Sequence, residues 1–116
     1  MSGSGFVELQ NAESLERFLE LTRETPAILF KHSNTCGISS QAYREMLRVK
    51  QPVGIVIVQD AREVSDEIER RFGIQHQTPQ ALIVLGDKLL WDASHSRVRA
   101  HIVEDAFGAV SGRGKR

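Results

Sequence analysis

The chain has 116 residues, which suits one domain built around one hydrophobic core. Apolar residues make up 41%, too many for a disordered chain, and 15 basic residues balance 15 acidic ones, so the zero net charge favours neither nucleic acid nor an acidic membrane as a partner. No apolar run approaches the roughly 20 residues that span a bilayer, and no secretory signal pattern is visible. The single cysteine excludes an internal disulfide and favours a reducing compartment, so we expect a cytoplasmic protein.

Apolar runs and apolar periodicity predict strands that alternate with helices. In chain order the predicted elements are a strand over 6–9, a helix over 12–24, a strand over 27–32, a helix from Ser39 to the limit set by Pro52, a strand over 53–58, a helix between Asp60 and Gly73, strands over 80–85 and 88–91, and a helix over 95–108. Alternation predicts parallel pairing, and the turn at Gly86-Asp87 adds an antiparallel hairpin. We therefore predict one α/β domain over 1–116, with a mixed central sheet, a C-terminal antiparallel hairpin and helices on both faces.

Residues near the helix ends predict where the helices begin and stop. Asn11 suits an N-cap, and Asp60 suits another, with Glu63 at capping-box distance. Gly73 and Gly108 are predicted C-terminal stops. We expect flexible ends outside these elements, a lead over 1–5 and a tail over 109–116.

The most informative segment surrounds Cys36, between a predicted strand and a predicted helix. A helix N-terminus carries a partial positive charge and unpaired N–H groups, so a thiolate there is stabilised and its pKa falls. The neighbours Thr35 and Gly37 are polar or small, which favours an exposed, reactive thiol over a buried, inert one. Gly37 also leaves room beside the sulfur for a bulky partner.

Ser39 occupies the position at which a dithiol redox protein carries its second cysteine. A hydroxyl forms no disulfide, so any mixed disulfide on Cys36 must be resolved by an outside thiol. Ser39 can donate a hydrogen bond to the thiolate, cap the helix, or do both.

Three further residues are candidates for the same site. Lys31 could hold the thiolate or a substrate carboxylate, although a lysine at a strand end is more often only solvated. Pro79 opens a core strand, where it withholds a ladder donor, and a cis bond after Thr78 is one reason for such a proline. The Thr78 backbone could then pair with an extended substrate. His32 and His76 are weaker candidates, and no metal motif is present.

Three segments together resemble the YtxJ-type monothiol bacilliredoxins of the thioredoxin-like superfamily. They are Lys31-His32-Ser33 leading into Thr35-Cys36-Gly37-Ile38-Ser39, then His76-Gln77-Thr78-Pro79-Gln80-Ala81, then Trp91-Asp92-Ala93-Ser94-His95. The resemblance spans about residues 8 to 108. It implies a thioredoxin-like fold with Pro79 in cis.

The resemblance also implies a chemistry. Cys36 would remove bacillithiol from S-bacillithiolated proteins and become bacillithiolated itself, and free bacillithiol or a partner reductase would regenerate it. Bacillithiol is then a co-substrate, with no tightly bound cofactor, and the chain would be a monomer or weak dimer. The family commonly has Pro after the cysteine where this chain has Gly37, so glutathione or another small thiol is an alternative to bacillithiol.

Two other functions are compatible with one reactive cysteine. Two chains, each giving Cys36, could hold an iron–sulfur cluster together with two small thiols, as monothiol glutaredoxins do. A brown colour on purification would favour this alternative. The other is a redox sensor or interaction module in which Cys36 is only modified under oxidative stress. Low turnover with stable adducts would favour the sensor.

Overall fold

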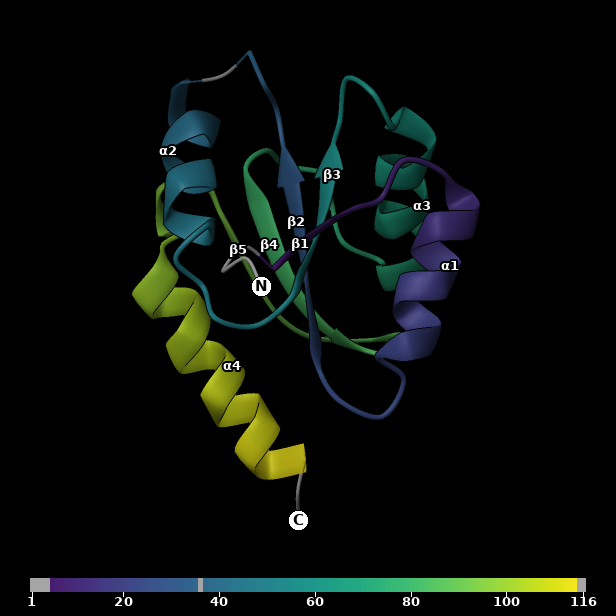
Figure 1. The fold of residues 1–116 in the computed structure, drawn as a ribbon, viewed down its shortest axis with the longest axis vertical. Coiled ribbons are helices and arrows are strands. Elements are labelled where there is room, and N and C mark those ends of the chain that lie inside the picture. Colours follow the sequence, from purple (N-terminus) through teal and green to yellow (C-terminus); the bar gives the residue numbers. More distant parts are fainter. Residues whose placement is uncertain (1–4, 36, 115–116) are drawn as a thin grey trace.

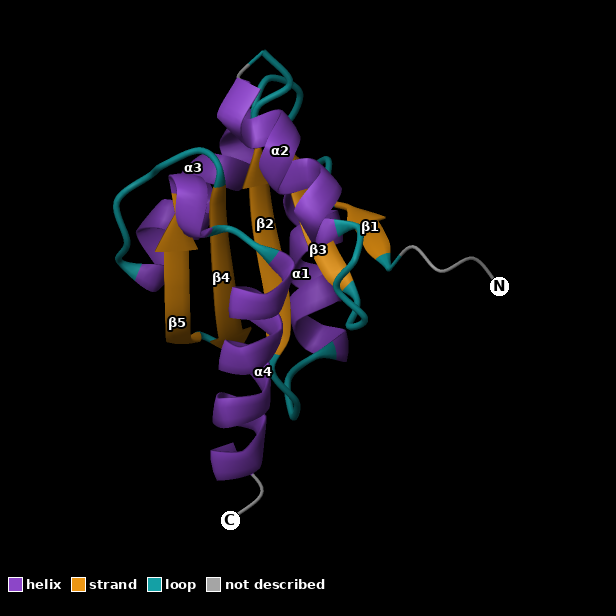
Figure 2. Cartoon of the chain, turned by 90° about the vertical axis from the view of Figure 1, so that its left-hand side faces the viewer, coloured by secondary structure: helices purple, strands orange, loops and turns teal. Residues whose placement is uncertain are grey.

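A computed structural model describes residues 5–35 and 37–114, and the side chains of residues 5–35 and 37–111. Within these residues the chain forms a five-stranded sheet in the order β1-β3-β2-β4-β5 (Figures 1 and 2). The strands are β1 (Phe6–Glu8), β2 (Ala27–His32), β3 (Val53–Ile57), β4 (Gln80–Leu85) and β5 (Lys88–Ser94). The helices are α1 (Ala12–Leu21), α2 (Gly37–Met46), α3 (Arg62–Phe72), α4 (Ala100–Gly114) and a short 3₁₀ helix (His95–Arg97). None of the described helices is long and apolar enough to cross a membrane.

The sheet is mixed, as predicted. β1, β3 and β2 run parallel, whereas β4 runs antiparallel to β2 and β5 antiparallel to β4. The antiparallel part therefore begins one strand earlier than alternation alone predicts. The reason lies in the connection over residues 73–79, which returns the chain to the carboxyl end of β2 before β4 starts.

Two helical layers cover the sheet, α1 and α3 on one face and α2 and α4 on the other (Figure 1). Every residue of β2 is buried, as a central strand covered on both faces requires. Its side chains alternate between the two layers, so Leu29 packs with α1 and α3, whereas Phe30 packs with α2 and α4. By this alternation Lys31 faces the α1–α3 layer and His32 the α2–α4 layer.

Two helix ends, the start of α1 and the end of α3, lie where the sequence predicts them. The side-chain oxygen of Asn11 accepts the Ser14 N–H at 2.8 Å, and the Ser14 hydroxyl oxygen accepts the Asn11 N–H at 3.1 Å, so the predicted N-cap of α1 is confirmed. Gly73 ends α3 with a φ of 61°, a left-handed conformation that glycine adopts without steric cost.

The predicted cap of α3 is wrong. The N-cap is Ala61, and no side-chain hydrogen bond caps this helix among the described residues. The turn after β3 explains the shift, because the N–H groups of Asp60 and Ala61 both donate to the Ile57 carbonyl. Asp60 therefore belongs to that turn, and Glu63 makes no capping box with it.

The final helix also differs from the prediction of one helix over 95–108. A 3₁₀ turn over His95–Arg97 comes first, and α4 then continues to Gly114. Gly108 lies inside this helix and does not end it, although a glycine there costs about 1 kcal/mol relative to alanine. Phe107 and Val110 pack against the α2–α4 core layer and offset that cost. Residues 109–114, expected as a flexible tail, are helical.

Candidate functional site

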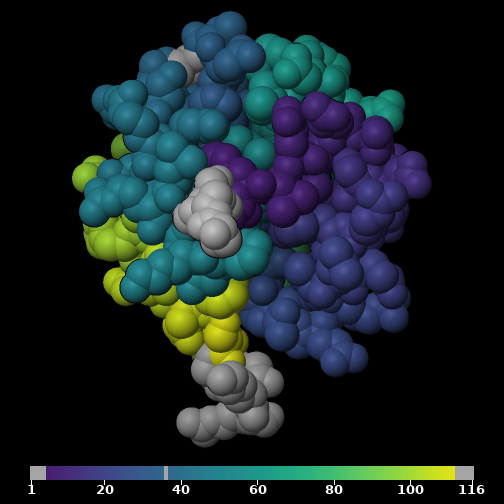
Figure 3. Space-filling view, in the orientation of Figure 1, coloured from purple at the N-terminus to yellow at the C-terminus, as the bar shows by residue number. Residues whose placement is uncertain are grey.

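The loop after β2 leads directly into a helix. β2 ends at His32, and α2 begins at Gly37, the residue that follows Cys36 in the sequence. Cys36 itself lies outside the described residues, and its flanking residues define the site. Along this segment Asn34, Thr35 and Gly37 are exposed. In the space-filling view the described residues of this segment lie among the blue ones at the top of the molecule (Figure 3).

The first turn of α2 leaves open space beside it. A β-carbon added to Gly37 would meet none of the described atoms within 4 Å beyond its chain neighbours, so packing does not require glycine there. Ile38 follows with 48% of its surface exposed.

Ser39 ties the start of this loop to α2. Its side chain is fully buried, and its hydroxyl oxygen accepts a hydrogen bond from the Ser33 N–H at 2.9 Å. The same oxygen lies 2.9 Å from Nδ1 of His32. Ser39 is therefore an anchor inside the first turn of α2, and it does not occupy the N-cap position.

His32 decides what the Ser39 hydroxyl can do. The imidazole is buried and contacts the rings of Phe30 and Tyr43, with centroids 5.8 and 4.9 Å away. Burial lowers the pKa of His32, which keeps the ring neutral at pH 7. With the ring proton on Nε2, Ser39 must donate to Nδ1. With it on Nδ1, the Ser39 proton is free for another acceptor.

Gln59 also holds the loop before Cys36, although no motif in the sequence marks it as a site residue. Its amide nitrogen donates to the hydroxyl of Ser33 at 2.8 Å and of Thr35 at 3.1 Å, and its amide oxygen accepts the Asn34 N–H at 3.2 Å. Gln59 follows shortly after β3, which runs parallel beside β2. That position is the signal that could have identified it, because the carboxyl ends of neighbouring parallel strands meet at one edge of the sheet.

Lys31 is fully buried, which corrects the expectation of a solvated side chain at a strand end. Its ammonium nitrogen lies 3.1 Å from Nδ1 of His76, and the Ser65 hydroxyl lies 3.2 Å from the same ring nitrogen. Burial lowers the pKa of Lys31 to about 8, with the charges of Glu69 and Asp66 acting in the opposite direction. Lys31 is therefore a buried cation that remains protonated at pH 7.

The protonation of His76 follows from this contact. Burial, and next the Lys31 charge, lower the pKa of His76, so its ring is neutral at pH 7. An ammonium group only donates, so Nδ1 accepts from Lys31 and the ring proton sits on Nε2. No group of three or more His, Cys, Asp or Glu suited to a metal ion occurs among the described residues.

The peptide bond between Thr78 and Pro79 is cis, as the resemblance implies. Lys31 pairs with Gln80 in the β2–β4 register, so Pro79 lies beside the end of β2 from which the thiol loop departs. The Pro79 carbonyl accepts the His95 N–H at 2.8 Å, which ties this proline to the end of β5. The fold thus brings the loop around Cys36 and the Thr78-Pro79 segment to one edge of the sheet, although they are some 40 residues apart in sequence.

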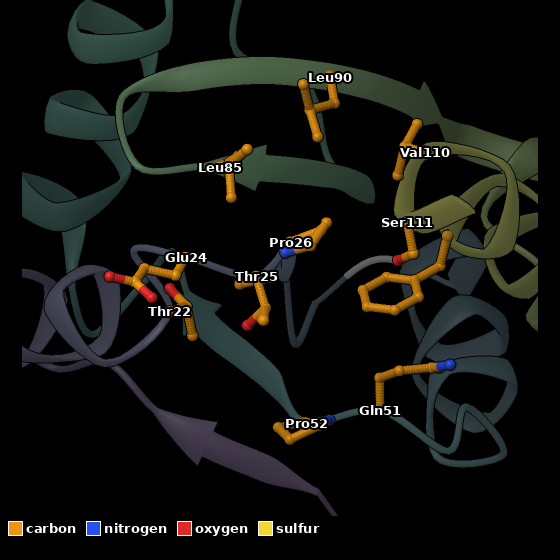
Figure 4. Close-up of a pocket in the computed structure, with 12 residues that line it drawn as sticks. Thr22, Glu24, Thr25, Pro26, Gln51, Pro52, Leu85, Leu90, Val110 and Ser111 are labelled. Atoms are coloured by element: carbon orange, nitrogen blue, oxygen red, sulfur yellow. The ribbon is translucent and has the colours of Figure 1, made fainter. Parts of the chain in front are cut away.

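Two hollows differ in their distance from this edge. A groove of about 320 Å³ runs between α2 and the 3₁₀ helix, and its walls include Ile38, Arg44, His95 and Arg99. A larger hollow of about 650 Å³ is lined mainly by apolar residues (Figure 4). It includes Ala27, the first residue of β2, so it lies at the end of the sheet opposite the thiol loop.

Known structures share this fold. The chain superposes on a structure described as "a putative oxidoreductase with a thioredoxin fold" with a TM-score of 0.80, at 24% identity, covering 88% of this chain and 93% of that one. Thioredoxin from Trypanosoma brucei brucei gives a TM-score of 0.75 at 11% identity, covering 94% and 93%. The reduced Schistosoma mansoni thioredoxin pre-protein gives 0.70 at 15% identity, covering 91% and 98%. The chain is a thioredoxin-fold protein.

The family follows from the sequence. The family model described as monothiol bacilliredoxin BrxC matches residues 7–103, which is most of the chain. The chain belongs to the monothiol bacilliredoxin family, and its function is thiol redox chemistry.

Proposed function

We propose that this chain removes bacillithiol, or a similar small thiol, from mixed disulfides on proteins through Cys36. Membership of the monothiol bacilliredoxin family is the observation that carries the proposal. The start of α2 directly after Cys36 supports it, because the partial positive charge of a helix N-terminus favours a thiolate. Iodoacetamide should then react with a thiol whose pKa lies below the roughly 8.5 of a free cysteine.

The reaction needs two exchange steps. The Cys36 thiolate attacks the small-thiol sulfur of the mixed disulfide, so one S–S bond forms on Cys36 while another breaks and the target cysteine leaves as a thiolate. A second small thiolate, or a partner reductase, then attacks the disulfide on Cys36 and restores its thiolate. No second cysteine is present in the chain, so the resolving thiol comes from outside.

Other residues of the site suit supporting roles in this proposal. Thr35 and Ser39 would shape the loop, Gly37 would leave room for the incoming disulfide, and the Ser39 hydroxyl would donate to the thiolate when His32 carries its proton on Nδ1. The Thr78 backbone would pair with the substrate chain beside Pro79. Lys31 would act through the field of its buried charge.

The groove beside α2 supports a carboxylate-bearing small thiol as co-substrate. Arg44 and Arg99 line it together with Glu45, whose carboxylate accepts the Ala100 N–H at 2.8 Å, and His95 and Ile38 connect it to both halves of the site. Bacillithiol carries carboxylates, and guanidinium groups bind carboxylates with paired hydrogen bonds. S-thiolated proteins are then the macromolecular partners, and exposed Ile38 offers them an apolar contact.

Replacing the cysteine tests the proposal directly. The Cys36→Ser variant should lose release of bacillithiol from an S-bacillithiolated protein, because a hydroxyl does not perform the exchange. The released thiol and the masses of both proteins would be measured by intact mass spectrometry. Ser40→Ala serves as the matched control. Ser40 is exposed in the first turn of α2, so this variant should keep full activity.

The same measurement separates the alternatives. Mixing the unmodified chain with bacillithiol disulfide or glutathione disulfide identifies which adduct forms on Cys36 and how fast added thiol removes it. Full activity of Cys36→Ser would refute the exchange mechanism. An adduct that forms but never clears would instead support a redox sensor.

A further inference from the structure

Hydrogen bonds hold residues 75 and 76, which precede the cis-proline, against the rest of the protein. The His76 N–H donates to a carboxylate oxygen of Glu69 at 2.9 Å, and the Gln80 side chain donates to the Gln75 carbonyl at 3.0 Å. The His76 ring adds the contact of its Nδ1 with Lys31 at 3.1 Å. This part of the chain therefore holds a fixed position next to Thr78.

His76 is exposed although one edge of its ring faces the buried Lys31. Nδ1 is occupied by the ammonium group, which leaves Nε2 with its proton on the remaining edge of the ring. No described residue accepts a hydrogen bond from that N–H, so it is available to a ligand. Lys31 makes no ion pair with any described carboxylate, so His76 is its hydrogen-bond partner among the described side chains.

We propose that His76 is a substrate-contacting residue whose Nε2–H donates to a backbone carbonyl of the S-thiolated protein, and that Lys31 is the positioning residue that fixes this orientation. This inference rests on the proposed function. His76 precedes Thr78 by two residues, a span of at most about 7 Å. A substrate chain paired with the Thr78 backbone would therefore pass within reach of the ring and present carbonyl groups to it.

The chemistry favours a neutral acceptor over a carboxylate. Arg62 and Lys31 contribute positive charge near His76, while Glu69 and Asp66 contribute negative charge. Charges of both signs therefore surround this hydrogen-bond donor. A peptide carbonyl matches such a donor, whereas the arginine-lined groove beside α2 is the better match for carboxylates.

Two substitutions separate a donor role from a structural role. In His76→Asn the amide oxygen can take the place of Nδ1 and accept from Lys31, but no group replaces the outward Nε2–H. In His76→Gln the amide N–H₂ reaches the position of Nε2, while the contact with Lys31 is lost. Each variant would be assayed with an S-bacillithiolated peptide of about ten residues and, separately, with bacillithiol disulfide, which has no peptide chain.

The proposal expects His76→Asn to lower kcat/KM for the peptide substrate about 3- to 10-fold, the usual effect of one lost hydrogen bond, with no change for bacillithiol disulfide. His76→Gln should retain more of the peptide activity than His76→Asn, but less than the unmodified chain, because its amide can still donate to the substrate but is no longer oriented by Lys31. The opposite pattern, a normal Asn variant and a defective Gln variant, would show that the ring only holds the loop and would overturn the proposal. An equal loss on both substrates would overturn the assignment to the peptide. If the unmodified chain turned over neither substrate, the proposed function would fail first and this inference with it.

Discussion

At the scale of single residues, the buried Lys31 is the feature that sets this site apart from an ordinary strand end. Its ammonium group is fully buried, and its hydrogen-bond partner among the described side chains is the neutral ring of His76. Taking an unpaired charge out of water is costly, and this cost lowers the pKa of Lys31 to about 8. A buried charged group with a strongly lowered pKa is a pattern that is typical of functional positions.

The lowered pKa predicts how stability depends on pH. Between about pH 8 and 10.5 the folded chain has lost the Lys31 proton while the unfolded chain still holds it, so the free energy of unfolding rises with pH in this window. Over the whole window the contribution is about 3 kcal/mol, at about 1.4 kcal/mol for each pKa unit. Urea unfolding of the unmodified chain and of Lys31→Met at pH 7, 8.5 and 10 measures it. The Lys31→Met variant should lack the rise and be more stable at pH 7.

An exposed lysine provides the comparison. Lys88→Met at the start of β5 should retain the pH dependence of the unmodified chain, because Lys88 is exposed. If Lys31→Met showed the same rise as Lys88→Met, another group would be responsible and the burial of the ammonium group would have no energetic effect.

At the scale of elements, the thiol loop is held by the strand next to the one that carries it. The strand pairing extends past β3, where the Val58 N–H donates to the His32 carbonyl at 2.9 Å. The chain then presents Gln59 to the loop over 33–35, while Ser39 holds the same loop from α2. The position of the loop before Cys36 thus depends on a local contact with Ser39 and on Gln59, which is 24 to 26 residues away in sequence.

Removing the Gln59 contacts tests whether the loop must be held. We expect Gln59→Ala to raise the pKa of Cys36, measured by iodoacetamide titration, because the thiol would no longer be kept at the start of α2. The variant should also lose about 1 kcal/mol of stability from the lost hydrogen bonds. Gln10→Ala, at another exposed glutamine, is the control. An unchanged thiol pKa in Gln59→Ala would show that α2 alone fixes the loop.

At the scale of the whole molecule, one end of the sheet is polar and the other is mainly apolar. The end where β2 finishes carries the polar networks of Ser39, Gln59 and His76. The opposite end carries the apolar hollow, to which the last part of α4 contributes Phe107 and Val110 (Figure 4). α4 therefore completes the end of the domain that is remote from the site.

Shortening the chain tests this role of α4. Deletion of residues 109–116 should lower the melting temperature by about 3–6 °C, the shift expected for a loss of about 1 kcal/mol in a domain of this size. The reason is that Val110 packs against the α2–α4 core layer. Val110→Ser in the full-length chain should reproduce part of the loss in differential scanning calorimetry. A shortened chain with an unchanged melting temperature would contradict the packing role and match a free tail.

Much of the fold was readable from local sequence. Strands β2 and β4 match the predicted apolar runs residue for residue, and Asn11 and Gly73 mark helix ends because their side chain or backbone chemistry acts locally. The family resemblance also correctly predicted the cis peptide bond before Pro79. Asp60 does not cap α3, because its backbone takes part in the hydrogen-bonded turn after β3. Gly108 does not end the last helix, because core packing of its neighbours outweighs its local preference.

What the sequence by itself determined is the order of elements and the place of Cys36 before a helix, since periodicity and capping depend on near neighbours. Only the tertiary structure decided that Lys31 is buried against His76 and that Gln59 holds the thiol loop. These pairs join residues 45 and 26 positions apart. Their contact depends on strand order and register, which no local pattern encodes.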